Sequence, residues 1–126
     1  MCRTIVLAVL VSLAAQAAAE SPAPISAAFG NTIVSTYPDG RQAELYLAQS
    51  GTYTAEGRRG DPSNGKWSVR RGKLCLKQAR PIPAPFAFCT IMPQSLSTDW
   101  SARAVTGESI RVKLVKGHFA PPGRPA

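Results

Sequence analysis

Residues 51–77 read GTYTAEGRRGDPSNGKWSVRRGKLCLK, and this stretch decides the fold. On each side of Arg71-Gly72, apolar and polar residues alternate, which is typical of two half-buried strands joined by a tight turn. A two-residue turn pairs Trp67 with Leu76 and leaves Cys75 on the opposite face, whereas a three-residue turn brings Trp67 near Cys75. A slip of one residue reverses every side chain, so the sequence leaves both registers open.

The quoted stretch opens with the return strand of another hairpin. Gln49-Ser50-Gly51 has the form of a three-residue hairpin loop, with glycine in the left-handed conformation. The apolar residues of the two strands then face each other in register, with Leu47 opposite Tyr53. The same register sets Glu44 opposite Glu56 on a face that we expect to be solvated.

Strand patterns continue on both sides of this region. Four more segments are expected to be strands: 32–37 and 86–91, which are rich in β-branched or aromatic residues, and the last hairpin of 100–105 and 109–115, in which apolar and basic residues alternate over 110–114. Residues 58–65 carry Gly, Asp-Pro and Asn-Gly turn signals and residues 79–85 carry three prolines, so we expect loops there. About eight short strands at intervals of about 8 to 12 residues predict an all-β protein. Sequential hairpins favour a small antiparallel up-and-down meander that is barrel-like (calycin-like).

The start of the chain has the pattern of a secretory signal peptide over residues 1–19. Arg3 precedes an apolar run over residues 5–13, and three alanines end at Ala19, where we expect cleavage. The apolar run is shorter than the about 20 residues of a membrane-spanning helix. We therefore expect a periplasmic or secreted protein with no transmembrane segment in its mature chain.

The rest of the chain is predicted to form one domain with two loose ends. Proline and small residues suggest a flexible N-terminal segment over residues 20–29 and a disordered tail over residues 120–126. Residues 30–119 form the single β domain. Its two cysteines, Cys75 and Cys89, predict one disulfide in an exported chain. This bond would close a loop of about 15 residues, which corresponds to about 3 kcal/mol of stabilisation.

Basic residues dominate the charge, which is +8 at pH 7 for the whole chain. A basic exported protein is suited to anionic envelope components. The candidate basic surface lies in or beside the quoted stretch and comprises Arg58, Arg59, Lys66, Arg70, Arg71, Lys73 and Lys77. We do not expect nucleic acid as a partner, because Trp67 should point into the core and offer no exposed stacking surface.

Residues with catalytic chemistry are sparse. The single histidine, His118, lies near the end of the chain, where a catalytic triad is hard to assemble. A zinc site needs several clustered ligands, which the chain does not offer once its cysteines are paired. Glu44 and Glu56 are the one carboxylate pair, and nearby arginines would neutralise them. We expect no enzyme, no catalytic residue, no metal and no cofactor.

The quoted stretch, followed by PAPFAFC at residues 83–89, resembles a set of uncharacterised small exported β proteins of alphaproteobacteria. A shorter element, Gly65-Lys66-Trp67 followed by Leu74-Cys75-Leu76, is similar to periplasmic inhibitors of secreted zinc proteases. That similarity implies an eight-stranded barrel with one disulfide and an N-terminal arm that enters the protease cleft. The G-x-W element is also similar to lipocalins.

Three hypotheses about function follow. The first is a non-enzymatic exported protein whose basic surface contacts an anionic envelope component or a periplasmic protein. The second is a small-ligand carrier that uses a barrel interior, although two Trp and four Phe in so short a chain favour a filled interior. The third is a periplasmic protease inhibitor with residues 20–29 as the inserting arm.

Overall fold

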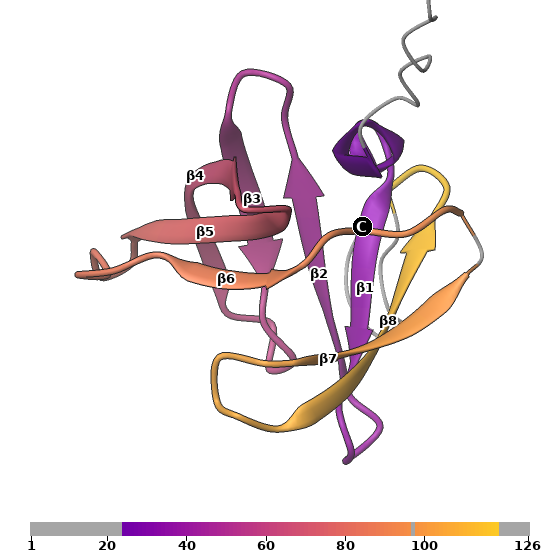
Figure 1. The fold of residues 1–126 in the computed structure, drawn as a ribbon. Helices are drawn as coiled ribbons and strands as arrows, with labels where there is room; N and C mark the ends of the chain where they lie inside the picture. The colour runs from indigo at the N-terminus through magenta and orange to yellow at the C-terminus, as the bar shows by residue number, and fades with distance from the viewer. Residues whose placement is uncertain (1–23, 97, 119–126) are drawn as a thin grey trace, which may run out of the picture.

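Eight antiparallel strands form one sheet that curls into a nearly closed barrel in the computed structural model (Figure 1). The structure describes residues 24–96 and 98–118. A short 3-10 helix, η1 (Pro24–Ala28), precedes the strands. The strands are β1 (Thr32–Thr36), β2 (Gln42–Leu47), β3 (Thr52–Glu56), β4 (Pro62–Arg70), β5 (Lys73–Arg80), β6 (Phe88–Ile91), β7 (Asp99–Arg103) and β8 (Ser109–Val115).

The strand order confirms the predicted up-and-down meander. Successive strands pair from β1 to β6, β7 pairs with β8, and β8 returns to pair with β1. Strands β6 and β7 therefore stand at the two ends of the order β6-β5-β4-β3-β2-β1-β8-β7. In the described part of the chain, no hydrogen-bonded register joins these two strands, so the barrel has a seam between them.

The β4–β5 hairpin takes the two-residue turn. Arg71 and Gly72 both have positive φ, 52° and 74°, as a primed turn requires for strands with right-handed twist. Trp67 consequently pairs with Leu76, and Cys75 lies on the opposite face. The β2–β3 hairpin also has the predicted register.

Gly65, the first residue of the G-x-W element, lies at a close approach of two backbones. The register of β4 against β5 shifts between Asn64 and Gly65, which marks a bulge. A Cβ at position 65 would overlap the carbonyl oxygen of Lys77, so only glycine fits without moving the neighbouring strand. Strand β4 already begins at Pro62, which pairs with Glu56 of β3, although the sequence predicted a loop as far as residue 65.

The predicted disulfide is present. Cys75 and Cys89 lie directly opposite each other on β5 and β6, and their Cα atoms are 3.9 Å apart. Because β6 has only one hydrogen-bonded neighbour in the sheet, this bond holds the strand at the seam to the rest of the barrel. Strand β6 begins at Phe88, two residues later than predicted.

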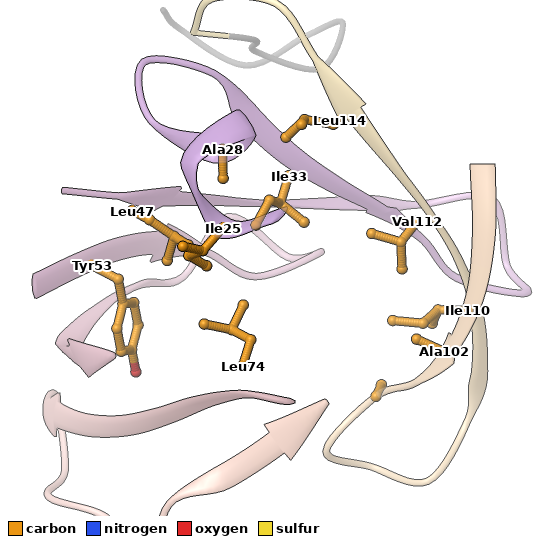
Figure 2. Packing of buried hydrophobic residues seen from close by; sticks show 11 residues of the cluster. Ile25, Ala28, Ile33, Leu47, Tyr53, Leu74, Ala102, Ile110, Val112 and Leu114 are labelled. Atoms are coloured by element: carbon orange, nitrogen blue, oxygen red, sulfur yellow. The ribbon is translucent and has the colours of Figure 1, made fainter. Parts of the chain in front are cut away.

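The helix η1 closes one end of the barrel, which we call the closed end. The sequence predicted a flexible segment here, but Ile25 is 7% exposed and Ala28 is 1% exposed. Both pack into the hydrophobic cluster with Ile33, Leu47 and other residues of the strand ends (Figure 2). Two buried apolar side chains in a single helical turn anchor the helix. The sequence did not indicate this, because most residues around them are small.

Trp67 of β4 packs at the closed end. Its ring lies 5.8 Å from that of Phe29, just after η1, and its Nε1 donates a hydrogen bond to the carbonyl of Ala48 at 2.7 Å. Trp67 is half-buried against the core, as predicted.

The described residues contain no helix with the length and apolar character of a membrane span. The predicted signal peptide, residues 1–19 with cleavage after Ala19, and the predicted tail, residues 120–126, both lie outside the described residues.

Candidate functional site

The barrel encloses a cavity of about 480 Å³. Near the closed end its wall includes Ile33, Tyr53 and Leu74, which the hydrophobic cluster also contains. At the other end its wall includes Phe86 and Val105, whose exposed fractions are 81% and 73%. The cavity therefore reaches solvent at the end opposite η1, which we call the open end. The prediction of a filled interior is wrong.

Small side chains leave part of the interior unfilled. Small side chains line much of the wall: Ser35, Ala43, Ala55, Ser63, Ala102 and Ala104. Phe29 and Trp67 pack at the closed end and Phe86 is exposed at the open end, whereas other aromatic residues form part of the cavity wall: Tyr37, Tyr53, Phe88 and Trp100. Counting aromatic residues gave the wrong answer, because volume inside a barrel depends on which residues point inward. In Figure 2, Leu74 and its neighbours stand apart from Ala102 and Ile110 across the interior.

The wall of the cavity is mainly apolar, with a few polar side chains. The neutral polar residues of the wall include Ser35, Ser63, Gln78 and Thr90, and three charged residues also line the cavity: Glu44, Glu56 and Arg103. In the described residues, no buried side-chain nitrogen or oxygen lacks a hydrogen-bond partner. Burial raises the pKa of Tyr53 above its ordinary value, as expected for a phenol in an apolar surrounding. Such an interior favours an uncharged or apolar occupant.

Arg58 ties three loops together at the open end. Its guanidinium lies 3.0 Å from Glu108 in the β7–β8 loop and 3.6 Å from Asp39 in the β1–β2 loop. It also stacks over the ring of Tyr37, 4.3 Å from the centroid. We call Arg58, Asp39, Glu108 and Tyr37 the arginine clamp. Burial is the main reason that the pKa of Tyr37 is raised, and the Arg58 charge partly opposes this effect.

The clamp separates Arg58 from the rest of the candidate basic surface, because two carboxylates already balance its charge. Arg59 is exposed in the same β3–β4 loop at the open end. The others lie along the β4–β5 hairpin and are all exposed: Lys66, Arg70, Arg71, Lys73 and Lys77. We call these five residues the basic hairpin.

The basic hairpin places like charges directly opposite one another. Lys66 pairs with Lys77 across the two strands, and Arg70 pairs with Lys73. Such pairs destabilise a sheet, so stability of the fold does not explain why these residues are basic. The exposed basic side chains therefore lie in a row along the outer face of this hairpin.

Of the remaining residues considered in the sequence, Glu44 and Glu56 are among those that line the cavity, and His118 is not. Glu44 pairs with Glu56 as predicted, but Glu44 is only 3% exposed and its neighbour Val34 only 4%, so the expectation that Glu44 is solvated is wrong. His118 is exposed, and its ring lies 4.8 Å from that of Tyr46. In residues 24–96 and 98–118, no three His, Cys, Asp or Glu side chains gather as metal ligands would.

The N-terminal segment does not have the geometry of an inserting arm in its described part. Ile25 and Ala28 are buried in the barrel's own core, so they would have to leave it before entering a protease cleft. Insertion of this segment into a protease cleft would therefore require η1 to leave the end of the barrel that it closes.

Fold and cavity together define the class: an eight-stranded up-and-down barrel that is capped at one end and hollow inside. Comparison with protein-family models, with curated proteins and with solved structures finds no match for this chain. The physical properties of the barrel are therefore the basis for assigning a function.

Proposed function

We propose that this protein binds a small apolar ligand inside its barrel and carries it in the periplasm or outside the cell. The observation that carries the proposal is the cavity of about 480 Å³ with a mainly apolar wall. Ligand pockets commonly have volumes of about 300–1,000 Å³, with an apolar lining and a few polar groups. An eight-stranded barrel is of the size that can hold one small ligand.

The arrangement of the two ends supports a carrier. The η1 helix and Trp67 seal one end, so a ligand would enter and leave through the open end. The arginine clamp joins three of the four loops there, which keeps the entrance formed when no ligand is bound. A pre-formed site binds with less loss of conformational freedom.

The test is binding of a neutral fluorescent probe, N-phenyl-1-naphthylamine, to the disulfide-intact protein. We expect saturable binding at one site, and we expect Ala102→Trp to weaken it by at least about tenfold because the indole would occupy the cavity. Ala79→Trp on the exposed side of β5 is the matched control and should not change the affinity. If Ala102→Trp does not fold, Ala55→Leu takes its place.

Two results would reject the carrier function. One is that the folded protein does not bind the probe. The other is that Ala102→Trp binds as well as the control does, which would locate binding outside the cavity.

The basic hairpin supports a second proposal, contact with an anionic envelope component such as lipopolysaccharide. Its opposed like charges, Lys66 with Lys77 and Arg70 with Lys73, are the observation that favours it. Binding through these exposed charges should weaken steeply as the salt concentration rises. Binding that is insensitive to salt would contradict it.

A further inference from the structure

The three most exposed large hydrophobic side chains in the described part of the chain all lie at the open end. Ile82 is 72% exposed and Phe86 is 81% exposed in the β5–β6 loop, and Val105 is 73% exposed in the β7–β8 loop. The other large hydrophobic residues on the described surface are at most 47% exposed. These two loops are neighbours around the barrel, on either side of the β6–β7 seam. We call Ile82, Phe86 and Val105 the apolar rim.

The apolar rim is held outward by the local structure. The side-chain amide of Gln78 donates a hydrogen bond to the Ile82 carbonyl at 2.8 Å, and the Ala84 backbone N–H donates one to the Gln78 carbonyl at 2.9 Å. Prolines at positions 81, 83 and 85 further restrict the backbone of this loop. A loop so constrained cannot readily fold its apolar side chains back onto the barrel.

Exposed arginines lie at the same end of the barrel as the apolar rim. Four exposed arginines lie in the loops or strand ends at this end of the barrel: Arg41, Arg59, Arg80 and Arg103. Of the carboxylates in the same described loops and strand ends, Asp39 and Glu108 are engaged with Arg58, which leaves Glu56 and Asp61 beside the four exposed arginines. The open end therefore combines exposed apolar tips with an excess of positive charge.

We propose that the open end docks on the surface of an anionic lipid bilayer. Apolar side chains of this size enter the boundary between headgroups and acyl chains, and cationic residues beside them pair with lipid phosphates. Arginine suits this role because its guanidinium can bind a phosphate through two hydrogen bonds. Because the arginines carry positive charge, the open end is more complementary to an anionic membrane than to an apolar patch on a protein.

Docking in this orientation would turn the cavity entrance towards the membrane. Phe86 and Val105 belong both to the apolar rim and to the wall of the cavity, so the apolar surface is continuous from bilayer to interior. An apolar ligand could then pass between them without crossing water. This consequence rests on the proposed carrier function, whereas docking itself does not.

The experiment measures binding of the disulfide-intact protein to vesicles of phosphatidylcholine mixed with phosphatidylglycerol, by co-sedimentation. We expect the double variant I82S/F86S to bind at least about tenfold more weakly than the wild type, because it removes two of the three apolar tips. The matched control is Val69→Ser, which removes a partly exposed apolar side chain at the far end of β4. It should change the affinity by less than about twofold.

Three further measurements make the outcome decisive. Vesicles of pure phosphatidylcholine should bind the wild type much more weakly than the anionic ones. The variant K66Q/K77Q, which neutralises part of the basic hairpin, should lose less affinity than I82S/F86S. Ala102→Trp should dock as the wild type does even where it no longer binds the fluorescent probe, so the failure of one proposal would not be mistaken for failure of the other.

The proposal is overturned if the wild type does not bind anionic vesicles, or if I82S/F86S binds them as tightly as Val69→Ser does. Greater loss in K66Q/K77Q than in I82S/F86S would move membrane contact to the basic hairpin and would also overturn it. Because Ile82 and Phe86 are exposed, their replacement should leave the thermal unfolding temperature unchanged, and this is checked by circular dichroism.

Discussion

Replacing Ala102 by leucine should stabilise this protein, although the same change destabilises a filled core. Ala102 is 9% exposed, lines the cavity and lies opposite Ile110 on β8. In a close-packed interior, extra methylenes force side chains off their rotamers and cost about 1–3 kcal/mol. Here the cavity of about 480 Å³ can receive them.

The expected size of the effect follows from the burial of the added carbons. Each methylene removed from water contributes about 0.8 kcal/mol, and leucine adds about three such groups to alanine. Ordering the leucine side chain costs about 0.5–1 kcal/mol. The net expectation is an increase of about 1.5 kcal/mol in the free energy of unfolding.

Urea unfolding followed by tryptophan fluorescence measures this change, with the free energy extrapolated linearly to water and the slope unchanged. Ala79→Leu on exposed β5 is the control and should stay within about 0.5 kcal/mol of the wild type. A destabilisation of about 1 kcal/mol or more in Ala102→Leu would show that the interior is already packed. It would also remove the basis for the carrier proposal.

Three other predictions concern the disulfide, pH and the arginine clamp. Replacing Cys75 and Cys89 together by serine should lower the free energy of unfolding by about 3 kcal/mol, measured by urea titration; an unchanged midpoint would contradict a role for this bond in holding β6. The folded-state pKa of Tyr53 is raised, so its contribution to stability is fully present below about pH 10 and is lost at higher pH, where the unfolded chain ionises first. Tyr53→Phe should therefore lose less stability than the wild type between about pH 9 and pH 11, and equal losses in the two proteins would refute the assignment. Arg58→Ala should lower the free energy of unfolding by about 1–2 kcal/mol through loss of the ring contact and two ion pairs. Arg59→Ala should have almost no effect in the same urea titration.

Most of the fold could be predicted because its signals are local. Alternation along each strand shows which side chains share a face, and turn residues such as Arg71-Gly72 show where the chain reverses. The antiparallel meander follows from these hairpins. The disulfide was predictable because Cys75 and Cys89 are the one possible pair once residues 1–19 are taken as a signal peptide.

Boundaries and ends were harder to predict. Pro62, Asn64 and Gly65 indicated a loop, but β4 pairs with β3 from Pro62 onward. Pro24–Ala28 carries too few apolar residues to reveal a buried helix, and its burial depends on the space that the strand ends leave at the closed end. Similarly, Arg58 was assigned to a basic surface because its two carboxylate partners are distant in sequence.

What the sequence by itself determined is the strand pattern, the register of the β2–β3 hairpin and the pairing of its cysteines, whereas the register of the β4–β5 hairpin came from the structure. What only the tertiary structure decided is that the barrel is hollow and that one of its ends is open. The volume of an interior depends on how side chains from all eight strands meet across it, so small residues such as Ala102 and Ser63 become informative only when they face one another. The candidate site is that shared space, and no single segment of the sequence contains it.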